Sequence, residues 1–520
     1  MIKHLKLSRR RFLQATAGAA ATAALHPTPG ISAGQRTLRI RSNRDIQVLD
    51  PGWMIGGTEI DMQINCLPTL AVFAPGDKLS WRPSDAVEAF TQEDELHYSF
   101  RLRPGMTWTN GFGEVTAEDV KYSFERIADP ANKAPWKAKW DALKEVQITD
   151  KLSGVIVLKE PFAPLIYTTL CNGTGAIVCK KAVQAKGGKF TSEFPAQAGP
   201  YLIKQWTPKQ YIDLARNPDW KGPAPEFEAI RVVFIEDEKP AEAAFEAGEL
   251  DLSGISLDSL PRYRKSAPTN SKLFEMPGLW WTWMGMNTEH PKLKDIRVRK
   301  AIQLAVDADA VNQAAYAGAA ARAHGVVPVG LLGHRARSAF DKPDPAKAKA
   351  LLAEAGVSDL SLELKTLNQT DRLTAAQVIQ ANLGEVGIKV EVVPLDSGPF
   401  WNLGVEKAGN DWKDLQMWIM RFGDSPDPSQ MTQWYTSDQV GVWNWERWKS
   451  PEFDELHKKA LVERDEEKRA AMYVRMQDIM EDTGAYVWLV FEPVEVIHRG
   501  DIRPAMLPGP QIYLPGFKSA

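Results

Sequence analysis

Residues 94–108 read DELHYSFRLRPGMTW and contain two strand patterns separated by a turn. From Leu96 to Leu102, apolar side chains alternate around His97, Ser99 and Arg101, which is typical of a strand with one buried face. Pro104-Gly105 then turns the chain into a second short strand at 107–109, and Asn110-Gly111 follows it. This order of signals predicts a β-hairpin.

The regions on either side of this stretch continue the mixture of helix and strand. Downstream, Thr116-Ala117-Glu118-Asp119 places a capping hydroxyl and early carboxylates before the apolar positions of a helix. Upstream, Leu38–Arg41 alternates like a strand and ends at the turn Asp50-Pro51-Gly52. Further strands are expected at Gly154–Leu158, Tyr211–Ala215 and Ile230–Ile235, and helices at Ala241–Ala247 and Val298–Ala305.

The second half of the chain contains a βαβ pattern. Between Lys342 and Val393 we expect, in order, a helix at Pro345–Ala355, a strand at Leu360–Lys365, a helix at Leu373–Val386 and a strand at Ile388–Val393. Two helices, Phe453–Arg464 and Glu466–Asp482, precede a strand at Tyr486–Val496 that is long enough to cross back into the first half. The chain is therefore expected to be an α/β protein of more than one domain.

Composition and charge narrow the class of protein. The chain has 520 residues, 44% of them hydrophobic and 25% charged, and no apolar run reaches the roughly 20 residues needed to cross a bilayer. The net charge of the whole chain is −3. Residues 1–33 carry five basic and no acidic residues, so the remaining residues have a net charge of −8. A mildly acidic body argues against a nucleic-acid partner.

The basic start has the parts of an export signal. A positive head is followed by an apolar stretch from Ala15 to Leu25 and by small residues near Ala33. Within the head, Ser8-Arg9-Arg10-Arg11-Phe12-Leu13 resembles the twin-arginine signal, and an Arg-rich ordinary secretory signal is the alternative. Both routes lead out of the cytoplasm, and the first cysteine is Cys66, which argues against an N-terminal lipid anchor. We expect a soluble periplasmic protein with residues 1–33 removed.

The chain has three cysteines, too few to cross-link or metallate a protein of this length. A disulfide between Cys171 and Cys179 would close the loop at 172–175, and two buried free thiols are the alternative. The sequence leaves both open.

Several blocks together resemble the extracytoplasmic solute-binding proteins of family 5, which serve ATP-driven importers of peptides, nickel and opines. The most specific block runs from Asp94 to Trp108 and continues through Thr116–Val120 to Ser123–Arg126. Similar blocks follow in the same order, namely 199–201, 216–220, 247–251, 286–287 and 295–302. The resemblance implies a bilobed periplasmic-binding-protein-like fold of the cluster C type, with an ABC permease and a small solute as partners, no cofactor, no metal and a monomeric state.

The resemblance also implies a division of the chain. We expect a larger lobe in two parts, with part a formed by residues 34–67, 197–278 and 485–520 and part b by residues 68–196. The second α/β lobe is expected at 279–484. A ligand would be enclosed in the cleft between the two lobes.

Two candidate ligand-binding segments follow from the resemblance. The loop 50–58 would face the solute and offer the backbone of Gly57 and the hydroxyl of Thr58, although a plain turn with Thr58 as helix cap is the alternative. The segment 417–428 includes Arg421 and resembles the one whose first aspartate, here Asp424, holds the amino group of a bound dipeptide. Asp424 and Asp427 as helix caps are the alternative.

One position departs from the family pattern. Peptide-binding relatives that hold a free carboxylate use an arginine in the loop before the helix that contains 375–380, and Thr366 stands there in this chain. Arg372 stands nearby and could reach the cleft with a different loop path, but an arginine one turn into a helix is more often solvated. The departure puts ordinary dipeptide specificity in doubt.

Eighteen tryptophans are present, and six of them lie in regions expected near the cleft, namely Trp280, Trp281, Trp283, Trp401, Trp418 and Trp434. Strand alternation places Trp281 and Trp283 on one face and Trp280 on the other, so only one set can face a ligand. We take Trp283, Trp401 and Trp418 as ligand-binding candidates. Aromatic faces suit sugar rings, cations or bulky apolar groups.

The sequence patterns that could indicate an enzyme are absent or incomplete. The sequence has no CxxC pair or HExxH, Gly173-Thr174-Gly175 lacks the third glycine of a dinucleotide loop, and 187–191 lacks the spacing of a P-loop. A GxSxG pattern at 30–34 has no preceding strand. We expect a binding protein for a peptide-like or opine-like solute, with an oligosaccharide, sugar conjugate or metal chelate as the alternative ligand.

Overall fold

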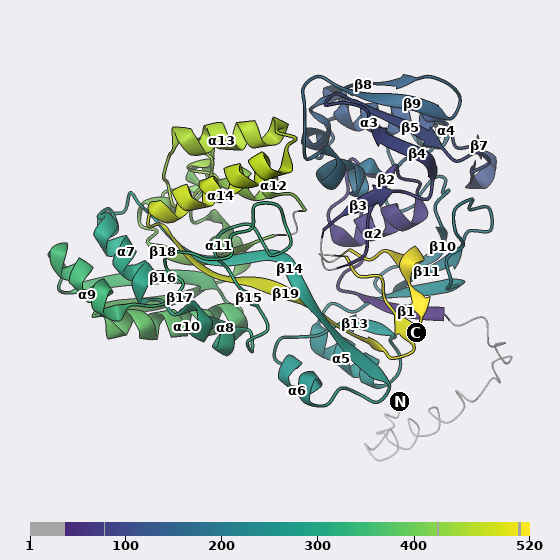
Figure 1. Ribbon diagram of the computed structural model, residues 1–520. Coiled ribbons are helices and arrows are strands. Elements are labelled where there is room, and N and C mark those ends of the chain that lie inside the picture. The colour runs from purple at the N-terminus through teal and green to yellow at the C-terminus, as the bar shows by residue number, and fades with distance from the viewer. Residues whose placement is uncertain (1–36, 77–78, 424–425, 508–510) are drawn as a thin grey trace, which may run out of the picture.

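The computed structural model describes residues 37–76, 79–423, 426–507 and 511–520. Its main feature is one sheet of eleven strands that runs through both halves of the molecule (Figure 1). The strand order is β10-β11-β12-β1-β13-β19-β14-β18-β16-β17, and β15 (Ala321–Arg322) pairs with β19. The expected α/β class is confirmed. The predicted signal at 1–33 lies outside the described residues.

Part of the large sheet belongs to the larger lobe. Its strands are β1 (Thr37–Ser42), β10 (Tyr201–Thr207), β11 (Tyr211–Arg216), β12 (Ala229–Phe234) and β13 (Leu252–Gly254). The helices of this region are α2 (Gly57–Cys66), α5 (Glu238–Glu246) and α6 (Leu260–Lys265). Helix α5 begins three residues before the expected start at Ala241, because Pro240 lies in its first turn, where a proline needs no N–H partner.

The strand expected at 96–102 belongs to a separate small sheet in the same lobe. Its order is β4 (Val87–Gln92), β5 (His97–Leu102), β9 (Ser153–Leu158) and β8 (Leu143–Ile148). The hairpin follows as β6 (Thr107–Trp108) and β7 (Gly113–Glu114), and helix α3 (Ala117–Ala128) has a capping box between Thr116 and Asp119. The strand at 96–102 and the helix are confirmed. The hairpin forms at Asn110-Gly111 between β6 and β7, whereas β5 pairs with β4 and β9 and not with the strand at 107–108. The remaining elements here are β2 (Ala71–Phe73), β3 (Trp81–Pro83) and α4 (Lys180–Ala185).

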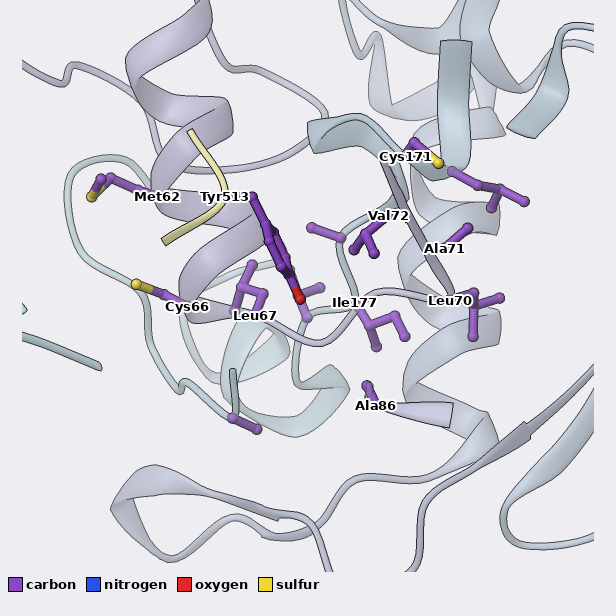
Figure 2. Packing of buried hydrophobic residues seen from close by; sticks show 14 of the residues in the cluster. Met62, Cys66, Leu67, Leu70, Ala71, Val72, Ala86, Cys171, Ile177 and Tyr513 are labelled. Carbon is purple, nitrogen blue, oxygen red and sulfur yellow. The ribbon is translucent and has the colours of Figure 1, made fainter. Parts of the chain in front are cut away.

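One hydrophobic core joins the two parts of the larger lobe. Figure 2 shows Leu67, which directly follows α2, Val72 of β2 and Ile177 packed around Tyr513 from the C-terminal segment. That segment also contains the short pair β20 (Ile502–Arg503) and β21 (Lys518–Ser519). The three cysteines are buried and free, so free thiols are the alternative that holds for Cys171 and Cys179.

The second lobe contains the expected βαβ unit. Strands β16 (Leu360–Leu367) and β17 (Ile388–Leu395) are parallel, and α10 (Thr370–Glu385) connects them. The other elements are α7 (Ile296–Ala305), α8 (Ala308–Ala315), α9 (Pro345–Glu354), α11 (Ser397–Asn402), β18 (Met417–Phe422), α12 (Pro428–Thr432), α13 (Pro451–Val462) and α14 (Glu466–Asp482). Among the described residues, no helix is long and apolar enough to cross a membrane.

Two long strands connect the lobes. Strands β14 (Ser271–Met286) and β19 (Tyr486–Arg499) are antiparallel, with pairs from Ser271↔Arg499 to Gly285↔Tyr486. They run from the larger lobe into the second lobe (Figure 1). The predicted return of the chain through the strand at 486–496 is confirmed. The domain boundaries given above stay a prediction, because the sheet is continuous along these strands.

Candidate functional site

The N-terminus of α2 forms one wall of the candidate site. The preceding loop is held by Asp50, whose buried carboxylate accepts hydrogen bonds from Arg126 at 2.8 and 3.0 Å. The helix begins at Gly57 with Gly56 as its cap, so the alternative of Thr58 as helix cap is wrong. The first N–H groups of a helix have no partner within it. The backbone at Gly57 and Thr58 therefore offers donors at this wall.

The side chain of Thr58 points toward β1. Its hydroxyl is 3.1 Å from that of Ser42, and the residue is buried. A Cβ on Gly57 would meet no atom within 4 Å, so open space lies in front of this glycine. The wall is thus polar through its backbone and open at Gly57.

A hollow of about 380 Å³ lies in front of this wall. Residues of β1, α2, β13, β14, β19 and the C-terminal segment line it, including Arg41, Arg44, Gly57, Thr58, Asp61, Trp280, Val494, Glu495 and Met506. The arginines are engaged, since Arg41 donates to the carbonyl oxygens of Ile235 and Glu236, and Arg44 pairs with Glu59. The hollow therefore combines two of the predicted residues with a tryptophan from the crossing strand.

Glu495 adds a carboxyl group to the residues around this hollow. Burial, together with the nearby carboxylates of Glu275 and Glu492, raises its pKa to about 8. Its enclosed Oε1 has no hydrogen-bond partner among the described residues. At neutral pH this group is mainly a neutral acid.

The crossing strand β14 divides its tryptophans between two faces, as expected. Trp281 and Trp283 are 0% and 1% exposed and stack with ring centroids 6.3 Å apart in the core of the second lobe. Trp280 points the other way and lines the hollow. Trp283 therefore lies away from the hollow, and Trp280 is the tryptophan of β14 that faces the hollow. The alternation of side chains predicted that only one face of β14 could line the hollow, but it could not show which face.

Trp418 is also a core residue. It is 0% exposed and packs against Trp445, with ring centroids 5.8 Å apart. Both Trp283 and Trp418 belong to the apolar cluster beneath α13 and α14, because β14 and β18 present these residues to the face of the sheet that α13 and α14 cover. In this conformation neither has the exposed surface that a ligand contact needs, which corrects the expectation for both.

Arg421 of β18 lies next to Trp280. Its guanidinium carbon is 4.5 Å from the centre of the Trp280 ring, and its side chain is 43% exposed. Its Nη1 donates to Glu492 Oε2 at 2.9 Å. The arginine thus connects β18 of the second lobe to the crossing strands beside Trp280.

Glu492 of β19 is the centre of a buried network. Its Oε1 accepts hydrogen bonds from Thr282 at 2.7 Å, Tyr316 at 3.1 Å and Arg372 at 2.5 Å. Burial opposes ionisation, but Arg372 and Arg421 overcome it and hold the pKa of Glu492 at about 2. Arg372 is 2% exposed, so its expected solvated position is wrong. Its partner Glu492 is more than a hundred residues away, and nothing near Arg372 in the sequence marks the pair.

Trp401 belongs to a partly exposed aromatic cluster in the second lobe. Its ring is stacked on Phe422 at 6.4 Å, and Trp443 lies 5.8 Å from both Phe422 and Trp434. Phe422 is followed by Gly423, where a Cβ would lie 2.6 Å from the Trp280 ring. The glycine thus lets the chain pass against Trp280 immediately before Asp424. Asp424 itself lies outside the described residues.

Asp427 is a structural residue. It caps α12 by accepting from Ser429 N at 2.9 Å, and its carboxylate pairs with Arg469 of α14 at 2.8 Å with both side chains buried. The helix-cap alternative is therefore confirmed for Asp427. It also borders a second hollow of about 480 Å³ between α12–α14 and part b of the larger lobe. Beside that hollow the lobes touch, since Ala163 N donates to Leu461 O at 2.8 Å.

The comparison with known families decides the class. Residues 80–442 match the model described as bacterial extracellular solute-binding proteins, family 5 middle. The chain belongs to this family. Its members matched here are substrate-binding proteins rather than enzymes, and the resemblance stated from sequence is confirmed.

Individual relatives of family 5 agree with this. The probable D,D-dipeptide-binding periplasmic protein DdpA of Escherichia coli (strain K12) is 27% identical over 469 residues, which cover 86% of each chain. HbpA2 from Haemophilus parasuis has a TM-score of 0.81 at 22% identity and covers 93% of this chain and 100% of its own. DppA from Helicobacter pylori in complex with peptide STSA has a TM-score of 0.71 at 24% identity, covering 90% and 95%. The fold is that of the bilobed binding proteins of cluster C.

Proposed function

We propose that this family 5 protein is the periplasmic solute-binding component of an ABC importer and that it captures a peptide-like or opine-like solute between its lobes. The observation that carries the proposal is the hollow at the junction of the lobes, where the N-terminus of α2 meets Trp280. Its volume of about 380 Å³ is in the range of small-molecule sites. The relatives named for dipeptides support the ligand class.

The proposed contacts follow from the chemistry of each group. Backbone N–H groups at Gly57 and Thr58 would bind a carbonyl of the solute, Asp424 its ammonium group, and Trp401 an apolar side chain. Enclosure between two lobes removes water, which strengthens such polar contacts. The protein would then be a monomer that presents its closed shape to permease subunits.

In the part of the chain that the structure describes, no group of three or more His, Cys, Asp or Glu side chains is placed to hold a metal ion. A bare metal ion as the solute is therefore not supported. An oligosaccharide, a sugar conjugate or a metal chelate stays the alternative. The aromatic cluster at Trp401, Phe422, Trp434 and Trp443 is the feature that would suit such rings.

Isothermal titration of the mature chain tests the ligand class. The panel contains di- and tripeptides, an opine, a neutral oligosaccharide and a nickel–histidine chelate. The proposal expects micromolar or tighter binding of a peptide or opine and none of the oligosaccharide. Tight binding of the oligosaccharide or chelate alone would overturn the peptide reading.

The export route has its own test. Changing Arg9→Lys together with Arg10→Lys should leave the precursor in the cytoplasm if the twin-arginine route is used, because that route requires both arginines. Unchanged export of this double variant would point to the ordinary secretory route. The fraction of processed chain in the periplasm is the readout.

A further inference from the structure

The donors of Arg421 are only partly used. One N–H reaches Glu492, and no other hydrogen bond of Arg421 is found among the described residues. The side chain is 43% exposed and its guanidinium carbon lies 4.5 Å from the centre of the Trp280 ring, which itself lines the hollow. Unfilled N–H donors are therefore presented beside Trp280, a residue that lines the hollow.

The surrounding network anchors Arg421 through one hydrogen bond to Glu492 and leaves its other N–H donors unused. Glu492 receives three donors on Oε1, from Thr282, Tyr316 and Arg372, and leaves Oε2 to Arg421. The other arginine is enclosed and also lies 3.2 Å from Asp371. The four charged groups, two arginines and two carboxylates, sum to zero. Arg421 thus keeps unfilled hydrogen-bond donors on an exposed side chain that is anchored by Glu492 and lies beside Trp280.

The other groups near the hollow are less suited to bind an anion. Arg41 and Arg44 are held by carbonyl oxygens and by Glu59. Thr366 is fully buried on β16. Arg372 has no exposed donor to offer. Arg421 is the arginine at this site that combines exposure with a held orientation.

We propose that Arg421 is the carboxylate-binding residue of the solute site and that the solute has a free carboxylate. The proposal rests on the proposed function and deepens it. An Arg fork binds a carboxylate through two parallel N–H···O bonds, which select for two oxygens in one plane. Glu492 and Arg372 are positioning residues that hold the fork in place.

The test compares matched ligands on wild-type protein. A panel of L,L- and D,D-dipeptides is titrated calorimetrically beside the C-terminal amide of each peptide. The proposal expects each acid that binds to bind at least tenfold more tightly than its amide. Amides that bind as tightly as the acids would overturn it while leaving the proposed peptide class intact. If no peptide binds in either form, the peptide class fails and the carboxylate site with it.

Substitutions then assign the effect to one side chain. Arg421→Gln should weaken the acids at least tenfold and the amides less than threefold, so that the preference disappears. Arg421→Lys keeps the charge but loses the fork and should recover only part of the preference. Arg475→Gln, which removes an exposed ion pair with Glu452 in the same lobe, is the control and should change neither affinity. Equal weakening of acids and amides by Arg421→Gln would show a structural role and contradict the proposal. The wild-type comparison needs no variant, so a folding defect cannot mask the answer.

Discussion

Arg421 of β18 reaches across β14 to Glu492 of β19, with Nη1 and Oε2 2.9 Å apart. The three strands are neighbours at the point where the chain crosses between the lobes. Because Glu492 is bound from the other side by Arg372, the ion network links α10 of the second lobe to the crossing strand. The candidate solute site therefore borders a buried set of charges that is fixed before any ligand arrives.

Removing one charge from this network should be costly. Arg372→Met leaves Glu492 buried with Arg421 as its remaining cationic partner, and we expect a loss of about 3 kcal/mol in the free energy of unfolding. The control Arg475→Met breaks an exposed pair and should cost less than about 1 kcal/mol. Urea denaturation measures both. Equal small losses would show that the buried network contributes little.

The stability of the second lobe should fall as the pH rises. Burial raises the pKa of Glu446 to about 8 from an ordinary value of 4.5. The folded chain therefore keeps a proton that the unfolded chain has released, and stability is lost between about pH 4.5 and pH 8 at about 1.4 kcal/mol per pH unit.

Glu446→Gln should remove this dependence, because the amide keeps a hydrogen-bonding group without a titrating proton. The difference in unfolding free energy between variant and wild type, followed from pH 5 to pH 8, should move in favour of the variant by several kcal/mol. Glu495 titrates in both proteins and cancels. Glu249→Gln, an exposed glutamate of the other lobe, is the matched control and should follow the wild-type curve. Parallel curves for Glu446→Gln and wild type would contradict the assignment.

Gly57 should tolerate a larger side chain in the free protein but not in the complex. A Cβ there meets nothing within 4 Å, so Gly57→Leu should leave the Tm almost unchanged while filling the hollow and lowering solute affinity at least tenfold. At Gly199 a Cβ would lie 2.4 Å from the backbone carbonyl carbon of Cys66, so Gly199→Ala should lower the Tm instead. Thermal unfolding and calorimetric titration separate the two effects. Full affinity in Gly57→Leu would exclude this wall from the site.

Trp280 and Trp283 should respond differently to a solute. Trp280→Phe should remove most of the change in tryptophan fluorescence on binding, because that ring lines the hollow. Trp283→Phe should retain the change but lower stability, because it deletes a buried ring and the 2.8 Å hydrogen bond to Glu446. A ligand-induced signal that depends on Trp283 would restore the sequence-based expectation for that residue.

Much of the fold was predictable because many of its helices and strands follow from patterns of neighbouring residues in the sequence. The alternation around Leu96–Leu102, the capping residues Thr116 and Asp119, and the βαβ pattern at 360–393 each depend on neighbours in the sequence, and the structure reproduces them. The signal at Gly57 and Thr58 came from the family resemblance, and both residues line a hollow.

The parts that sequence could not supply depend on long-range contacts. Arg372 was expected in solvent because nothing within its helix announces Glu492, which arrives on β19 from the far end of the chain. Alternation separated Trp280 from Trp281 and Trp283, but which face the helices α13 and α14 cover is decided by tertiary packing. Trp418 was misplaced for the same reason.

Native mass spectrometry of the protein purified from the periplasm, followed by denaturation and identification of the released molecule, tests the central claim most directly. The account predicts a small co-purified solute with a free amine and a free carboxylate, such as a peptide or an opine. A neutral sugar, or a metal chelate without an amine, would contradict the peptide-like assignment and move the binding role to the aromatic cluster at Trp401.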